Sequence, residues 1–314
     1  MATPILLDCD PGHDDAVAML LAAANDRIDL RAITTVAGNC PLELATLNAR
    51  RVAALAGLSG VPIAAGAAGP LNGSELHTAP DIHGVTGLDG YDLTTGEAPL
   101  DDRPALQLIA DVLEAADEPI TLVPTGPLTN IAQFLQARPD LHERIREIVF
   151  MGGSTGRGNV TPAAEFNIFV DPEAAAIVFE SGLPVTMIGL NLTHQARATR
   201  EVLERVRALP GEPARALEGW MSFFGSTYER VHGEFAPPVH DPCTVALLID
   251  PSLIRCVDSF VAVELEGRWT RGATVVDLNG RLGQPANARV AMELDAPRFW
   301  DLVLGALQSL SRGA

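Results

Sequence analysis

The chain contains no lysine, so all 22 of its basic residues are arginine, against 40 acidic residues and a net charge of −18. Nucleic-acid backbones and anionic membrane surfaces are poor partners for so acidic a protein, and we expect it to bind neither. The missing lysine also excludes P-loop enzymes with a Walker motif and enzymes that hold pyridoxal phosphate as a Schiff base.

Long apolar runs and clustered cysteines are also missing. No stretch approaches the roughly 18 consecutive apolar residues of a membrane span, and no basic segment of the signal-peptide type precedes the first apolar run. The four cysteines stand apart without a CxxC pair, which argues against a zinc site or a disulfide framework. We therefore expect a cytoplasmic protein whose cysteines are small buried residues.

Four aspartates crowd the stretch that follows the first apolar run, Ile5 to Leu7. They are Asp8, Asp10, Asp14 and Asp15, with the turn Pro11-Gly12 between the two pairs. The apolar residues after them predict a helix whose first turn carries Asp14 and Asp15, where acidic side chains suit the positive end of the helix dipole. The dipole offsets only part of the charge, so the cluster indicates a hard cation held by oxygen ligands.

Strand and helix patterns alternate along the chain. Further strands are predicted at residues 28–36, 61–64, 120–123, 145–151 and 184–190, and helices at 41–56, 104–117, 128–136, 174–180, 199–232, 243–249 and 296–311, with a break near Pro210. Pro127 is expected to open one helix, and Asp171 to cap another that begins at Pro172. This alternation is typical of βαβ units in a mostly parallel sheet flanked by helices, and we expect residues 1–314 to form a single α/β domain.

Two segments depart from this alternation. Residues 66–100 are rich in Gly, Pro, Asp and Thr, and a loop of this length inside a compact domain is usually functional or disordered. Alternating residues at 260–265 and 274–278 predict a small antiparallel addition near the C-terminus.

Five motifs at the predicted strand ends are similar to those of the inosine-uridine nucleoside hydrolase family. They are residues 8–16 (DCDPGHDDA), 34–39 (TTVAGN), 125–130 (TGPLTN), 159–171 (NVTPAAEFNIFVD) and 240–242 (HDP), in the family's order. The resemblance implies a doubly wound α/β fold, a tightly bound Ca²⁺ and hydrolysis of the N-glycosidic bond of purine or pyrimidine ribonucleosides in nucleoside salvage. It also implies a homodimer or homotetramer, and it leaves the preferred base open.

The same resemblance implies the ligands of the calcium ion. They are Asp10, Asp15, the backbone carbonyl of Thr125 and Asp241, all oxygen donors of the kind that a hard cation prefers. Asp10 is also expected to take the proton of the attacking water, which gives an oxocarbenium-like transition state without a covalent intermediate. Asn39 is expected to support the catalytic water or the ribose.

The resemblance further implies contacts to the nucleoside. Asp14 and Asn167 are expected to hold the 2′ and 3′ hydroxyls, and Asn159 and Glu165 the 5′ hydroxyl. His240, next to Asp241, is expected to protonate the departing base, a function that suits an imidazole.

Tyr228 and His83 are weaker candidates for contacts to the base. Asp8 receives no role, and the other five histidines, His13 among them, are expected to be structural. Asp89 stands where the family more often has glycine, which leaves the conformation of its loop open.

Three other interpretations of the sequence compete with that of a nucleoside hydrolase. A solvated turn with helix-capping acids is disfavoured because strand, turn and helix are all in place. A haloacid-dehalogenase-like phosphatase also begins with a strand and Asp-x-Asp, but it normally uses a lysine, and here Pro11-Gly12 follow Asp10. An inactive calcium-dependent nucleoside-binding protein is opposed by the intact Asp10, Asn167 and His240.

Overall fold

An eight-stranded sheet runs through residues 2–313, which are the residues described in this computed structural model. Its strands are β1 (Thr3–Cys9), β2 (Ile28–Thr35), β3 (Ile63–Ala65), β4 (Ile120–Pro124), β5 (Ile145–Met151), β6 (Val185–Ile188), β7 (Ile254–Ser259) and β10 (Ala288–Leu294). Two further strands, β8 (Val261–Val263) and β9 (Thr274–Val276), form a separate pair. The order across the sheet is β3-β2-β1-β4-β5-β6-β10-β7, and every pairing is parallel except β10 with β7. The chain therefore winds outward in both directions from β1 and β4, as predicted for a doubly wound fold.

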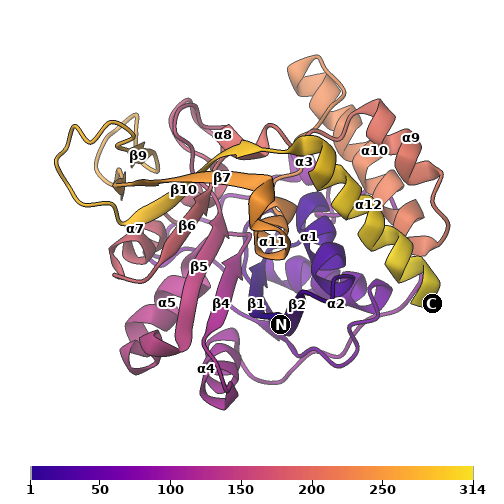
Figure 1. Cartoon of the computed structure of the whole chain (residues 1–314), viewed down its shortest axis with the longest axis horizontal. Helices are drawn as coiled ribbons and strands as arrows, with labels where there is room; N and C mark the ends of the chain where they lie inside the picture. Colours follow the sequence, from indigo (N-terminus) through magenta and orange to yellow (C-terminus); the bar gives the residue numbers. More distant parts are fainter. Residues whose placement is uncertain (1, 314) are drawn as a thin grey trace.

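Helices cover both faces of this sheet (Figure 1). They are α1 (His13–Ala23), α2 (Leu42–Leu55), α3 (Pro80–His83), α4 (Ala105–Ala115), α5 (Thr129–Ala137), α6 (Phe166–Val170), α7 (Pro172–Glu180), α8 (Leu190–Thr193), α9 (Arg200–Arg207), α10 (Glu212–His232), α11 (Pro242–Ile249) and α12 (Ala296–Gly313), with 3₁₀ turns at Pro139–Arg144 and Pro251–Leu253. None of the helices within residues 2–313 combines the length and apolar character that a membrane span requires.

Two apolar clusters, one on each face, follow from the alternation of side chains along the strands. In β1, Ile5, Leu7 and Cys9 pack into a cluster with α1, α2, α10, α11 and α12, whereas Leu6 packs into a second cluster with α4, α5 and α7. A central strand buried on both faces has no solvent-facing positions. This explains why β1 is apolar from Pro4 to Leu7.

The carboxyl-terminal part of the sheet was only partly predicted. The expected antiparallel addition is the β8–β9 pair, and the β9 part of it lies at the left edge of Figure 1. The strands β7 and β10, however, extend the main sheet and were not predicted. Their patterns are broken by charged residues such as Arg289 and Asp258, which are exposed, so neither strand reads as an apolar run.

Two smaller predictions about helix starts have different outcomes. Asp171 caps α7, and its carboxylate accepts the N–H of Ala174 at 3.0 Å, with Pro172 in the first turn, as predicted. Pro127 does not open α5, which has Leu128 as its N-cap and begins at Thr129. The prediction was wrong because Pro127 lies one residue before the cap, still within the turn that follows β4.

Asp171→Ala should lower the free energy of unfolding by about 3 kcal/mol. Besides capping α7, the buried carboxylate accepts the hydroxyl of Thr129 at 2.7 Å and the N–H of Leu71 at 2.8 Å. Denaturant unfolding measures the loss. Thr199→Ala is the matched control, because Thr199 caps α9 through the N–H of Val202 alone, and about 1 kcal/mol is expected there. Equal losses in the two variants would contradict the cross-linking role of Asp171.

Candidate active site

The candidate site lies at the carboxyl ends of β1 and β4, where the strand order of the sheet reverses. Asp10 follows the last residue of β1, and Asp14 and Asp15 stand in the first turn of α1. The carboxylate of Asp15 accepts the N–H of Gly12 at 3.0 Å, which gives this backbone donor at the start of the helix a hydrogen-bond partner. Ligand sites of doubly wound sheets form at such a reversal point, because the connections on either side leave a crevice there.

Three buried carboxylates meet at this point. Asp14, Asp15 and Asp241 each place a carboxylate oxygen within 4.8 Å of the others. Asp241 is the N-cap residue of α11, but its side chain makes no capping hydrogen bond and is therefore available to the cluster. The turn after β1 and the start of α11 thus form one acidic site, which brings Asp15 and Asp241 of the expected ligand set together with Asp14.

Asp10 stands beside this group and is enclosed by backbone. One of its oxygens, Oδ2, accepts the N–H of Asn39 at 2.6 Å, and the other, Oδ1, has no hydrogen-bond partner among the described residues although it is fully buried. A Cβ at Gly38 would lie 2.1 Å from Oδ2, and a Cβ at Gly126 would lie 2.5 Å from Oδ1. Only glycine at these positions allows the ends of β2 and β4 to approach the carboxylate so closely.

Burial and mutual repulsion raise the pKa values of the clustered acids. Burial is the larger cause for each, and it holds the pKa of Asp10 and Asp241 well above the usual range and raises that of Asp14 to about 7. The pKa of Asp15 is raised as well, and its charge raises those of the other three. A hard divalent cation fits this cluster, because all of its donors are oxygen atoms, its carboxylates repel one another and one buried oxygen has no partner among the described residues.

Thr125 and Asn167 adjoin the aspartates as predicted. The hydroxyl of Thr125 donates to Oδ1 of Asp15 at 2.7 Å, and its carbonyl oxygen accepts the side-chain N–H of Asn167 at 2.8 Å. Asn39 also donates to Oδ2 of Asp15 at 3.3 Å. Four residues named from the sequence thus lie within one hydrogen-bond network. They are Thr125 in the turn after β4, Asn167 on α6, Asp15 on α1 and Asn39 in the loop after β2.

Glu165 has a structural contact that the sequence did not reveal. Its carboxylate caps α6 by accepting the N–H groups of Asn167 and Ile168 at 3.0 and 3.2 Å, and it also accepts that of Gly153 at 2.8 Å. Burial nevertheless raises its pKa to about 7. Asn159 is exposed, and its backbone N–H bonds to Ala164 at 3.1 Å; within residues 2–313 no hydrogen bond joins it to the aspartates.

Two of the predicted histidines also adjoin the aspartates. The backbone N–H of His240 donates to Asp14 at 3.2 Å, and its Nδ1 lies 2.7 Å from the hydroxyl of Thr193. Burial, with a smaller effect of His194, lowers the pKa of His240 to about 3. The buried ring of His83 lies against Gly12, where a Cβ would be 2.7 Å from its Nδ1.

Tyr228 is half-buried on α10, where Arg197 and Glu234 act on its phenol. Burial raises the pKa of that phenol. Neither of these two charged groups belongs to the aspartate cluster.

Asp8 and His13, for which the sequence indicated no more than a structural role, make specific contacts beside the site. Oδ1 of Asp8 accepts the hydroxyl of Thr34 at 2.6 Å and the side-chain N–H of Asn130 at 2.7 Å, so Asp8 joins β1 to β2 and to α5. Burial raises its pKa to about 7. His13 pairs with His83, with their Nδ1 atoms 3.0 Å apart. The only signal for His13 was its position inside the aspartate motif.

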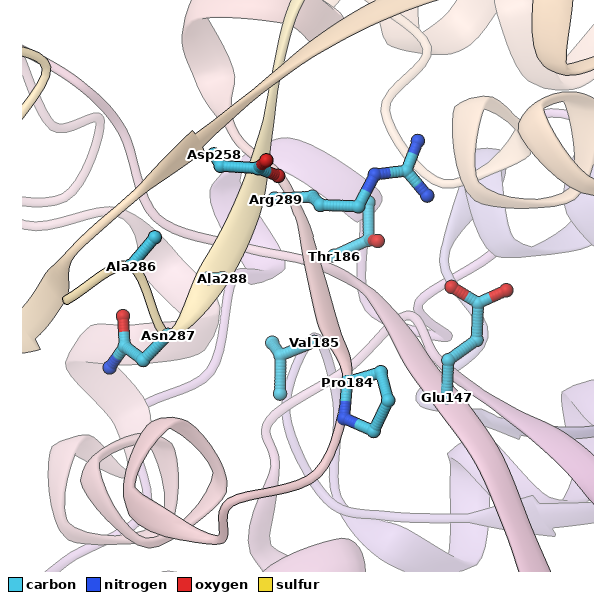
Figure 2. A pocket seen from close by; sticks show the side chains of 9 residues that line it. All are labelled: Glu147, Pro184, Val185, Thr186, Asp258, Ala286, Asn287, Ala288 and Arg289. Carbon is cyan, nitrogen blue, oxygen red and sulfur yellow. The ribbon is translucent and has the colours of Figure 1, made fainter.

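A pocket of about 350 Å³ opens elsewhere, at the amino ends of β6 and β10 (Figure 2). Its charged lining residues are Glu147, Asp258 and Arg289. It lies at the edge of the sheet opposite the aspartates, so it is not part of the candidate site.

Comparisons with known proteins identify the family of this chain. A family model described as inosine-uridine preferring nucleoside hydrolase matches residues 5–301. The chain is 47% identical over 309 residues to the pyrimidine-specific ribonucleoside hydrolase RihA of Shewanella sp. (strain MR-7), covering 98% of this chain and 96% of the relative. It is 45% identical to RihA of Enterobacter sp. (strain 638), covering 99% of each chain.

Solved structures give the same picture. A purine-preferring ribonucleoside hydrolase from Gardnerella vaginalis superposes with a TM-score of 0.90 at 31% identity, covering 99% of this chain and 100% of that one. A plant nucleoside hydrolase superposes with a TM-score of 0.92 at 30% identity, covering 98% and 99%.

Calcium at about a hundred times its dissociation constant should raise the melting temperature by about 5 °C over the chelated protein, because a cation offsets the repulsion among the aspartates. Differential scanning calorimetry measures the shift. Asp241→Asn should reduce it strongly. Asp301→Asn, which changes a surface carboxylate paired with Arg205, should leave it unaltered. An equal melting temperature with and without calcium would show that the cluster binds no such ion.

Proposed function

The chain belongs to the inosine-uridine preferring nucleoside hydrolase family and is an N-glycosidase, and we propose that it hydrolyses pyrimidine ribonucleosides to free base and ribose with calcium as its metal. The observation that carries the mechanism is Oδ1 of Asp10, a buried carboxylate oxygen without a partner among the described residues, beside three further buried aspartates. The proposal rests on this geometry together with the family match.

The ligands of the calcium ion would be Asp10, Asp15, the carbonyl oxygen of Thr125 and Asp241. When bound, such an ion lowers the pKa of a water and orients ribose hydroxyls. The position of Asp15 supports this set, because the hydroxyl of Thr125 and the N–H of Gly12 hold its two oxygens in place. Asp14 has the backbone N–H of His240 as its donor and would face the ribose.

Asp10 would act as general base. The N–H of Asn39 holds Oδ2, and Oδ1, which has no hydrogen-bond partner among the described residues, would accept the proton. The water that loses its proton attacks the anomeric carbon as the bond to the base breaks. Positive charge that develops on the ribose is stabilised by the surrounding carboxylates.

Polar side chains on several elements would position the ribose. Asp14 and Asn167 would bind the 2′ and 3′ hydroxyls, and Asn159 and Glu165 the 5′ hydroxyl. The amide of Asn167 already lies 2.8 Å from the carbonyl of Thr125, which supports a position next to the metal ligands. Asn39 would support the ribose or the attacking water. Holding the ribose in this way would accelerate the reaction by fixing the orientation of the ribose.

His240 would donate a proton to the departing base, with Thr193 fixing its ring through Nδ1. His83 and Tyr228 would contact the base. The relatives that are 45–47% identical are named pyrimidine-specific, whereas the purine-preferring structure is 31% identical, and this difference supports a pyrimidine preference. The family match gives no support to a phosphatase.

A cytoplasmic location and a homodimeric or homotetrameric state complete the proposal. The net charge of −18 supports a protein that avoids nucleic acid and anionic membranes. Its role would be the release of bases from nucleosides for salvage.

Asp10→Asn should lower kcat for uridine hydrolysis by a factor of about 10² to 10⁴, because the amide cannot take a proton. Reducing-sugar release measures the rate. Asp8→Asn is the matched control, since Asp8 is equally buried two residues earlier but binds Thr34 and Asn130. It should keep most of the activity while losing stability. Full activity of Asp10→Asn would remove Asp10 as the base.

The kcat/KM for uridine and cytidine should exceed that for inosine and adenosine by at least about tenfold. In addition, 2′-deoxyuridine should be a poor substrate, because it leaves the groups that bind the 2′ hydroxyl without a partner. Initial rates of base release over the five nucleosides measure this. Faster hydrolysis of inosine would contradict the pyrimidine preference. Absence of hydrolysis with all five would contradict the proposed activity.

A further inference from the structure

A row of polar side chains crosses the sheet face that packs against α11, at the end away from the aspartates. Thr186 of β6 pairs with Arg289 of β10, and Arg289 pairs in turn with Asp258 of β7. Paired residues of neighbouring strands direct their side chains to the same face. Glu147 shares this face, because Val149, two residues later on β5, pairs with Thr186. Polar side chains of four neighbouring strands are thus side by side.

The same face becomes apolar one side-chain repeat further along. Val149, Ile188 and Ala291 follow the polar residues of β5, β6 and β10 by two positions, and all three are buried in the apolar cluster that contains α1 and α11. The helix-covered part of the face therefore ends between these two rows. The polar row occupies the part that the helices leave open.

A pocket of about 350 Å³ opens beside the polar row (Figure 2). It follows from the short pairing of β6 with β10, which consists of Thr186 with Arg289 and Met187 with Val290. The residues just before these pairs, such as Pro184, line the pocket instead of continuing the pairing. Its volume falls within the range of roughly 300–1,000 Å³ that is usual for small-molecule sites.

The hydroxyl of Thr186 is the feature that points to a ligand. The residue lines the pocket but is only 1% exposed, and its Oγ1 has no hydrogen-bond partner among residues 2–313. It lies close enough to the carboxylate of Glu147 to lower the pKa of that acid, yet no hydrogen bond of ordinary length joins the two. Buried hydroxyl groups normally have a partner, and a ligand group in the pocket would supply it.

Arg289 and Glu147 keep hydrogen-bonding capacity for such a ligand. Burial raises the pKa of Glu147 and the charge of Arg289 lowers it, so the two groups lie near each other. Figure 2 shows the guanidinium and the carboxylate on the same side of β6, with the hydroxyl of Thr186 between them. Arg289 has the thiol of Cys256 as a hydrogen-bond partner, but within the described part of the chain it forms no ion pair with a carboxylate. Most of its five N–H donors are therefore available.

The lining of the pocket decides the chemical class of the ligand. Its charged groups are one guanidinium and the carboxylates of Glu147 and Asp258, so the acids would repel a phosphate dianion and Arg289 would repel a simple cation. No aromatic side chain lines it, so a flat nucleobase finds no stacking surface there. The described residues offer no cluster of three metal-ligating side chains except the aspartates of the candidate active site. A small zwitterion, in contrast, matches charges of both signs.

We infer that this pocket is a second ligand site, which binds a small zwitterion of the free amino acid class with its carboxylate on Arg289 and its ammonium group between Glu147 and Thr186. The guanidinium would donate two parallel N–H bonds to the carboxylate. The ammonium group would donate to the carboxylate of Glu147 and to Oγ1 of Thr186, which gives the buried hydroxyl oxygen its partner. The exposed carboxylate of Asp258 disfavours amino acids with an acidic side chain.

Isothermal titration calorimetry of the intact protein tests the inference, with L-alanine, L-valine and L-proline as probes. Acetate and ethylammonium are control ligands, because each carries only one of the two charges. Arg289→Gln and Thr186→Val each remove one proposed partner and keep a side chain of similar shape. Arg255→Gln is the matched control variant, since Arg255 is an exposed arginine of β7 that pairs with Glu293 and does not line the pocket.

The wild type should bind at least one of the three amino acids with a dissociation constant below about 1 mM, and acetate and ethylammonium at least about tenfold more weakly. Arg289→Gln and Thr186→Val should each raise the dissociation constant about tenfold, and Arg255→Gln should leave it unaltered. If Thr186→Val does not fold, Arg289→Gln decides, because Arg289 is exposed.

Two results would overturn the inference. One is a wild type that binds none of the three amino acids at about 10 mM, and the other is an Arg289→Gln variant that binds them as tightly as the wild type. None of these measurements uses a nucleoside. Failure of the second site therefore leaves the proposed hydrolase function unaffected, and failure of hydrolysis leaves the second site unaffected.

Discussion

Repulsion among the buried carboxylates of Asp10, Asp14, Asp15 and Asp241 is the constraint on which the rest of the site depends. Each is surrounded by protein, and burial together with the charge of Asp15 raises the pKa of Asp10, Asp14 and Asp241, so the folded chain holds them together only with protons or a cation between them. A hard divalent cation satisfies all of them with one particle and prefers their oxygen atoms. The proposed metal binding, base catalysis and ribose orientation would therefore be three uses of a single electrostatic arrangement.

The sheet supplies the geometry of that arrangement. Parallel pairing of β1 with β2 and β4 brings three strand ends to one edge, and Asp8 fixes them by binding Thr34 and Asn130. Glycines at two of these ends allow the backbone to enclose Asp10. Packing of α11 against α1 brings Asp241, more than 200 residues later in the sequence, to the same site.

Much of this was predictable from the sequence, and the rest has physical reasons for escaping it. The parallel sheet followed from the strand patterns, and the proximity of Asp15 and Asp241 was implied by the family resemblance of the motifs. The strands β7 and β10 escaped because one face of each carries exposed charged residues, such as Asp258 and Arg289, in place of an apolar pattern. The pair of His13 and His83 escaped because contacts across 70 residues leave no periodic signal. The capping of α6 by Glu165 was not predicted, because the sequence around Glu165 reads as a polar stretch and does not indicate this short helix.

A crystal structure of the protein grown with calcium tests the central claim most directly. The account predicts one ion per chain, bound by carboxylate oxygens of Asp10, Asp15 and Asp241 and by the carbonyl oxygen of Thr125, with metal–oxygen distances of about 2.3–2.6 Å. Asp14 should turn to the ribose side. Density for the ion at another place, or aspartates that keep their positions with no ion among them at saturating calcium, would contradict it.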